Sequence, residues 1–176
     1  VGMACFFPGA AGLAPYWANI LAGQNAITEV AKERWNPDIY YDPDATQSGK
    51  AGRKTPSKWG GFLPAISFDP VTFGIPPKSL ASIEPVQLLA LEAARRAMLD
   101  AGYADREFDR ERASVIFGAG AGTDLSGAYG FRAMYPQFMG PIPPALDEHL
   151  PTLTEDSFPG VLANVIAGRI ANRLDF

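Results

Sequence analysis

The strongest periodic pattern of apolar positions lies between residues 82 and 101. It predicts a helix that Ser82 caps, that accepts Pro85 in its first turn and that Gly102 ends. Leu88 and Leu91 widen the apolar face, so we expect other elements to cover this helix on most sides. The apolar stripe itself consists of Val86, Leu89, Ala90, Ala93 and Ala97.

Charged positions on the same helix predict an ordinary solvent-facing side. Glu84 lies in the first turn, where the helix dipole favours an acid, and Glu92 is spaced to pair with Arg96. We therefore expect Glu84, Glu92 and Asp100 to be capping or solvated carboxylates, because nothing in their spacing favours a glycosidase-type acid pair.

Further helices are predicted at 13–22, followed by Gly23, at 124–139 and at 157–174. Apolar and β-branched runs predict buried strands at 1–7 and 114–117. Strands separated by helices favour an α/β fold. On the last helix, one face is apolar and small residues would let another backbone come close. The apolar face is Leu162, Val165, Ile166, Ile170 and Leu174, and the small residues are Gly160, Ala163, Ala167, Gly168 and Ala171.

The segment from 24 to 80 has little periodicity. It is rich in proline, glycine, aspartate and aromatic residues, and the aromatic content indicates an ordered layer and not a disordered linker. A loop of this length in a compact domain usually carries function or an interface. Lys50, Arg53, Lys54 and Lys58 form a basic cluster within it, which is either a solvated loop or a contact for an acidic partner.

Composition excludes several classes of protein. The 176 residues are 47% hydrophobic, enough for one sizeable core, and the net charge of -4 gives no footprint for nucleic acid. No apolar run approaches a membrane span, and the apolar start lacks the basic region of a signal peptide. A single cysteine excludes a disulfide framework and fits a reducing cytoplasm. Both ends lie in apolar sequence, so we expect 1–176 to be part of a larger domain, cut at both ends.

Residue types that usually carry catalysis are sparse. Cys5 lies between Ala4 and Phe6 in the predicted first strand, where a thiol acts as a small buried hydrophobe and not as a nucleophile. His149 lies in a loop bounded by proline and is expected at the surface. One cysteine and one histidine provide no zinc site of the usual spacing.

A glycine-rich run at 118–122 follows the predicted strand at 114–117. In a dinucleotide-binding oxidoreductase, the last glycine of the fingerprint would stand where Thr123 is, and an acid would end a following strand about 20 residues on. Neither feature is present. A backbone turn that needs close packing or a positive φ explains the glycines more simply.

Short motifs run in a fixed order through the whole chain. They include the opening segment 1–10, Tyr16-Trp17, Tyr40-Tyr41-Asp42-Pro43-Asp44, Gly60-Gly61-Phe62-Leu63, Phe68-Asp69-Pro70, the segment 83–92, Asp100-Ala101-Gly102 and Ala167-Gly168-Arg169-Ile170. Together they resemble the N-terminal half of the β-ketoacyl synthase (ketosynthase) domain of type I polyketide synthases. Phe6 replaces a common arginine and Glu84 a usual aspartate. With these two departures and its 138–153 region, the chain resembles iterative synthases of the enediyne or polyunsaturated fatty-acid type.

This resemblance implies a thiolase-like fold, with two similar α/β halves in αβαβα layers, and a homodimer. The implied reaction is a decarboxylative Claisen condensation. A cysteine carries the growing acyl chain as a thioester, and two histidines assist decarboxylation of a malonyl group. That malonyl group is held on the phosphopantetheine arm of an acyl carrier protein, and the domain binds no cofactor of its own.

None of these three catalytic residues falls within the chain. The resemblance places the cysteine shortly beyond Phe176 and the histidines later, so this part alone should be inactive. The resemblance also implies that Ala121 lines the acyl tunnel. It further implies that Phe158 lies close to the position where a residue, of the same or the partner subunit, approaches this tunnel.

A non-catalytic thiolase-fold partner, such as a chain-length-factor or decarboxylase-like subunit, is the alternative. The residue in the nucleophile loop after Phe176 would separate the two. A half-domain further predicts a large exposed apolar face on the side that holds the 157–174 helix.

Overall fold

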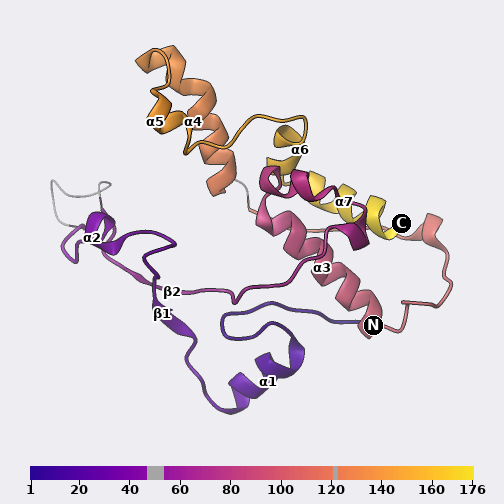
Figure 1. Cartoon of the computed structure of the whole chain (residues 1–176). Coiled ribbons are helices and arrows are strands. Elements are labelled where there is room, and N and C mark those ends of the chain that lie inside the picture. The colour runs from indigo at the N-terminus through magenta and orange to yellow at the C-terminus, as the bar shows by residue number, and fades with distance from the viewer. Residues whose placement is uncertain (47–53, 121–122) are drawn as a thin grey trace. The chain divides into compact units, whose positions relative to one another are not determined.

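The computed structural model describes residues 1–46, 54–120 and 123–176 (Figure 1). The chain divides into two compact units. One unit is Ala4–Ile66, and the other combines Val1–Met3 with Ser67–Phe176. No helix within the described ranges is both long and apolar enough to cross a membrane.

The unit Ala4–Ile66 contains short elements. Helix α1 (Leu13–Leu21) ends at Gly23, whose φ of 60° is the left-handed conformation that favours glycine, so the predicted helix and its end are confirmed. Its described residues also form β1 (Ile27–Glu29), α2 (Pro37–Tyr40) and β2 (Trp59–Gly61). The two strands pair antiparallel, with Ile27 opposite Gly61.

The second unit is built around α3 (Pro85–Asp100) and α7 (Val165–Leu174), which lie side by side (Figure 1). Leu91 is fully buried between them, and Ile166 and Ile170 of α7 are 1% and 2% exposed, as the apolar face predicted. The core is completed by Phe73, Ile75, Ile83 and Ala90. The remaining elements are the 3-10 helices η1 (Val71–Phe73), η2 (Pro77–Ser82) and η3 (Arg110–Arg112), and the helices α4 (Asp124–Met139), α5 (Pro144–Asp147) and α6 (Ser157–Val161).

Helix α3 begins three residues later than predicted. Ser82 belongs to η2, and its hydroxyl lies 2.9 Å from that of Thr154 instead of capping α3. Glu84, the N-cap residue, has an extended ψ of 133° because a residue before proline is disfavoured in the helical region. Pro85 is the first helical residue and Gly102, at φ 75°, follows the end, as predicted.

Both predicted buried strands are wrong. Neither 1–7 nor 114–117 has strand pairing, apart from one bridge between Phe7 and Ala10. Within the described residues the sheet consists of β1 and β2 alone. An extended apolar run becomes a strand only when a neighbour supplies ladder hydrogen bonds, and local sequence does not encode that neighbour. Val115 packs against the core, whereas Ile116 is almost fully exposed.

The exposed apolar surface lies mostly elsewhere than predicted. Phe158 on α6 is 74% exposed, but the exposed positions of α7 are small or polar. Helix α4, whose bounds match the prediction, carries the larger set: Phe131, Met134, Phe138 and Met139.

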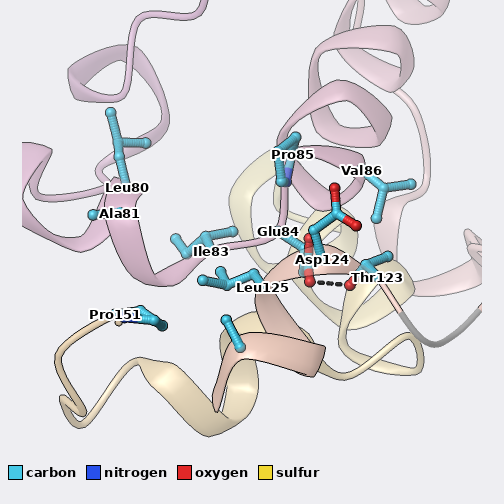
Figure 2. Close-up of a pocket in the computed structure, with 11 residues that line it drawn as sticks. Leu80, Ala81, Ile83, Glu84, Pro85, Val86, Thr123, Asp124, Leu125 and Pro151 are labelled. Atoms are coloured by element: carbon cyan, nitrogen blue, oxygen red, sulfur yellow. Dashed lines mark hydrogen bonds between the residues drawn. The ribbon is translucent and has the colours of Figure 1, made fainter. Parts of the chain in front are cut away.

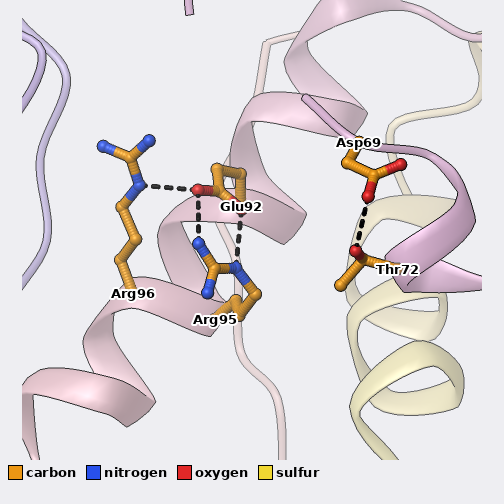
Figure 3. Close-up of polar contacts among 5 residues, drawn as sticks. All are labelled: Asp69, Thr72, Glu92, Arg95 and Arg96. Carbon is orange, nitrogen blue, oxygen red and sulfur yellow. Dashed lines mark hydrogen bonds and ion pairs between the residues drawn. The ribbon is translucent and has the colours of Figure 1, made fainter. Parts of the chain in front are cut away.

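Glu92 is buried, which corrects its prediction as a solvated charge. Its carboxylate is 2.8 Å from both Nε and Nη2 of Arg95 and 2.7 Å from Nε of Arg96, which confirms the predicted i,i+4 pair and adds a second arginine (Figure 3). The same figure shows Asp69 accepting from the Thr72 hydroxyl at the start of η1. Hydrogen bonding from Arg95 outweighs burial, and with Arg96 it holds the pKa of Glu92 below its usual value.

We expect Glu92→Gln to lower the free energy of unfolding by about 1–2 kcal/mol at pH 7. A depressed folded-state pKa gives stability that is present above the unfolded-state pKa of about 4.3 and is lost as pH falls through the folded value. The difference between wild type and variant in urea denaturation should therefore shrink as the medium is acidified below about pH 5. Glu107→Gln, at an exposed position, is the control. A difference that stays constant down to about pH 3 would contradict the assignment.

Candidate functional site

The start of α3 joins three other elements of its unit. Glu84 is 4% exposed, and its carboxylate accepts hydrogen bonds from the Thr123 hydroxyl and, at 2.9 Å, from the Ser126 amide. Figure 2 shows the contact with Thr123. Because Thr123 and Ser126 lie at the N-terminus of α4, Glu84 supplies from another helix the acceptor that an N-cap side chain normally provides. This contact also corrects the prediction that Glu84 is a first-turn or solvated charge.

The same contact argues against a nucleotide site at the glycine-rich run. A phosphate at the start of α4 would need first-turn amides, and Glu84 already bonds the Ser126 amide while Asp124 adds a second negative charge nearby. The simpler explanation is also wrong for the two described glycines. Gly118 and Gly120 have no positive φ, a Cβ atom added to either would meet no heavy atom of the described residues within 4 Å, and nothing in the structure explains them.

Gln87 is the second polar residue at this junction and is 1% exposed. Its Nε2 atom donates to the carbonyl oxygens of Pro159, Gly160 and Leu162, at 3.0, 2.7 and 3.2 Å. The Glu84 amide donates to the Gly160 carbonyl as well, at 2.9 Å.

These bonds explain why the predicted helix at 157–174 is two helices. In a continuous helix, the carbonyls of 159 and 160 would accept from amides four residues later. Here Gln87 and Glu84 occupy them, and Leu162 turns extended, with ψ 125°, between α6 and α7. The break is therefore specified by residues more than 70 positions earlier in the chain.

Arg169 completes the network from α7. Its Nε donates to Oε1 of Gln87 at 2.9 Å, so both ends of the Gln87 amide are bonded. Burial, and then the nearby charge of Arg173, lower the pKa of Arg169. Gln87 and Arg169 lie in motifs that carry the family resemblance, but the sequence predicted no role for either. A glutamine between Val86 and Leu88 on a widened apolar face is the signal that could have indicated a buried polar role.

A pocket of about 700 Å³ opens beside Glu84, between the η2–α3 junction and the first turns of α4 (Figure 2). Its volume falls within the range of about 300–1,000 Å³ that small-molecule sites occupy. The lining is mostly apolar, with Glu84, Thr123 and Asp124 as its polar residues: Leu80, Ala81, Ile83, Glu84, Pro85, Val86, Thr123, Asp124, Leu125, Ala128 and Pro151. The pocket can hold an apolar group with one polar end.

The predicted site residues are not gathered in this pocket. Ala121 lies outside the described residues, and Phe158 is exposed on α6 and does not line it. His149 is exposed, as predicted, whereas Cys5 is half-buried and not the fully buried thiol expected. In the basic cluster, Lys58 pairs with Glu29 at 2.5 Å.

Lys54 is exposed, and Lys50 and Arg53 lie outside the described ranges. Over the part of the chain that the structure describes, no three His, Cys, Asp or Glu side chains gather in a way that could hold a metal ion.

Comparison with known proteins decides the family. The family model described as the β-ketoacyl synthase N-terminal domain matches residues 1–176, the whole chain. The chain belongs to the β-ketoacyl synthase family. This confirms the resemblance that the ordered motifs indicated.

Curated relatives of this ketosynthase chain include polyketide synthases. Polyketide synthase ThaG of Burkholderia thailandensis is 40% identical over 119 residues, which is 67% of this chain and 2% of that protein. Polyketide synthase PksN of Bacillus subtilis is 37% identical over 121 residues, 68% of this chain and again 2% of the relative. The chain thus spans a very small share of these relatives.

Solved ketosynthase structures establish the fold. The oxazolomycin ketosynthase domain of Streptomyces albus JA3453 superimposes with a TM-score of 0.68 at 23% identity, covering 100% of this chain and 27% of that one. The ketosynthase from module 6 of the bacillaene synthase of Bacillus subtilis 168 gives a TM-score of 0.59 at 25% identity, covering 100% and 24%. The chain has the thiolase-like fold of the N-terminal part of a ketosynthase domain, as predicted.

Proposed function

We propose that this chain is the N-terminal part of one ketosynthase domain that catalyses decarboxylative condensation of an acyl thioester with a malonyl thioester. The observation that carries the proposal is the family match, which runs from the first residue to the last. The names of the relatives, which are polyketide synthases, support a role in polyketide or fatty-acid assembly.

The reaction needs a nucleophile that 1–176 does not supply. In the proposed scheme a cysteine thiolate of the complete domain attacks the incoming acyl thioester, forms an acyl-enzyme and releases the donor thiol. Loss of carbon dioxide from the malonyl group then generates a carbanion equivalent. It attacks the acyl-enzyme carbonyl, forms the new carbon–carbon bond and frees the cysteine.

The proposed contribution of this chain is to hold the acyl chain. We assign Ala121 to the wall of the acyl tunnel and Phe158 to its approach, by their positions in the family motif. The exposure of Phe158 leaves its ring available for such a contact.

Ala121→Trp should reduce the loading rate of the longest acyl thioesters by tenfold or more, a factor on the order of the free-energy penalty for overfilling a packed pocket. The loading rate of an acetyl thioester should stay near that of the wild type. Loading rates of the intact protein across a series of chain lengths measure this. Unchanged long-chain loading would rule out the assignment of Ala121.

The proposed partners follow from the reaction. The substrates would arrive on the phosphopantetheine arm of an acyl carrier protein, the domain would work as a homodimer beside other synthase domains, and the single cysteine of the chain suits a reducing cytoplasm. The iterative subtype stays a prediction from the Phe6 and Glu84 departures.

The first test is acyl loading of the intact protein. Incubation with a thioester donor, followed by digestion and mass spectrometry, should reveal one acylated cysteine outside 1–176. Cys5→Ala serves as the control and should leave the adduct in place. An intact protein with no acylated cysteine would favour the non-catalytic partner.

A further inference from the structure

The segment that carries Phe158 is anchored by hydrogen bonds on both sides. On the N-terminal side, Ser157 is 5% exposed, and its Oγ accepts from the Thr154 amide at 2.8 Å. The Thr154 hydroxyl in turn lies 2.9 Å from that of Ser82. On the C-terminal side, the carbonyls of Pro159 and Gly160 are held by Gln87. Phe158 stands between these two anchors.

The two anchors hold different parts of the chain in place. The hydroxyl chain fixes the start of α6 against η2. Gln87 spans both pieces of the broken helix, because its amide reaches two carbonyls of α6, the Leu162 carbonyl after it and, through Arg169, the second turn of α7. Loss of Gln87 therefore removes its three bonds to the corner between α6 and α7, keeps the Glu84 amide bond to the Gly160 carbonyl, and leaves the apolar core of α3 and α7 in place.

The packing of the Phe158 side chain itself could do little to replace that anchor. Its side chain is 74% exposed, whereas the residues on either side of the corner, Gly160 and Ile166, are buried. The position of the Phe158 Cα is consequently set by the backbone path, and Gln87 makes three of the hydrogen bonds that hold this path.

We propose that Gln87 is a positioning residue for acyl-chain selection: it fixes the α6–α7 corner and thereby the placement of Phe158. The inference rests on the proposed function, since it names what controls the chain-length preference of that reaction. Gln87 touches no reacting atom and acts through Phe158.

The test compares Gln87→Leu with wild type in the intact protein, using acyl thioesters of increasing chain length. The ratio of long-chain to short-chain kcat/KM for loading should change by about tenfold, because misplacing a positioning group by about 1 Å has effects of this order or larger. Gln137→Leu, the same substitution at an exposed position of α4, is the matched control and should leave the ratio unchanged.

A double-mutant cycle with Phe158→Ala separates positioning from general stability. If Gln87 acts through Phe158, adding Gln87→Leu to Phe158→Ala should change the ratio no further. Arg169→Leu, which removes the bond that orients the Gln87 amide, should shift the ratio in the same direction by a smaller factor and serves if Gln87→Leu does not fold.

The results that would overturn the positioning role differ from those that would overturn the proposed function. A decrease by the same factor at every chain length, or additive effects in the cycle, would overturn the positioning role while leaving the condensing activity standing. A wild-type protein that loads no acyl group at all would overturn the proposed function itself.

Discussion

Replacing Leu91 with alanine should lower the free energy of unfolding by about 3–4 kcal/mol. Leu91 is fully buried in the core with Ile166 and Ile170, so the truncated side chain would leave a cavity that the paired helices α3 and α7 cannot close without repacking. Urea denaturation of the intact protein, followed with a probe in this unit, measures the change.

The same substitution on the same helix provides the control. Leu99 is 46% exposed near the end of α3, and Leu99→Ala should cost less than about 1 kcal/mol. Equal losses of unfolding free energy at the two positions would mean that Leu91 is not buried as it is in this structure.

Gly160→Ala should be the second large effect, with a loss of about 2–4 kcal/mol. A Cβ atom at this position would collide with the carbonyl group of Ser82, which is backbone and cannot rotate away. To relieve the clash, α6 would have to move off η2, and the bonds from Gln87 and the Glu84 amide to the Gly160 carbonyl would be lost.

Gly168→Ala is the matched control and should have the opposite sign. Gly168 lies within α7 with no atom within 4 Å of an added Cβ, so alanine should stabilise the helix by about 0.5–1 kcal/mol. Melting temperatures of the two variants compare the effects directly. A Gly160→Ala protein as stable as wild type would show that α6 and η2 do not approach as closely as described.

Helix positions with local causes could be predicted from the sequence. The 124–139 prediction matches α4, and the ends of α1 and α3 fall where Gly23 and Gly102 adopt positive φ. In each case the signal is local: an apolar period, or a glycine that the left-handed conformation requires.

Features with distant causes could not be predicted in this way. The segment 157–174 has an unbroken helical period, yet Gln87 and Glu84 divide it by bonding carbonyls from more than 70 positions away. The runs at 1–7 and 114–117 have strand composition but no neighbouring strand among the described residues, and only Phe7 forms a bridge, with Ala10.

Glu92 gives an electrostatic example. Its spacing to Arg96 predicted the ion pair, and Arg95 adds a second pair at i,i+3, but the burial of Glu92 depends on the packing of α3 within its unit, which the spacing of charges does not specify. For the candidate site, the ordered motifs identified the family, whereas the Glu84–Gln87 junction became apparent only when its partners on α4, α6 and α7 were in place.

Carbon–carbon bond formation by the intact protein tests the central claim most directly. Purified protein, an acyl thioester and malonyl acyl carrier protein would be combined, and the carrier-bound product would be followed by mass spectrometry. We expect a β-ketoacyl product whose formation accompanies release of carbon dioxide and stops when the acylated cysteine is replaced by alanine. Release of carbon dioxide without a β-ketoacyl product, or no reaction with any acyl donor, would contradict the claim.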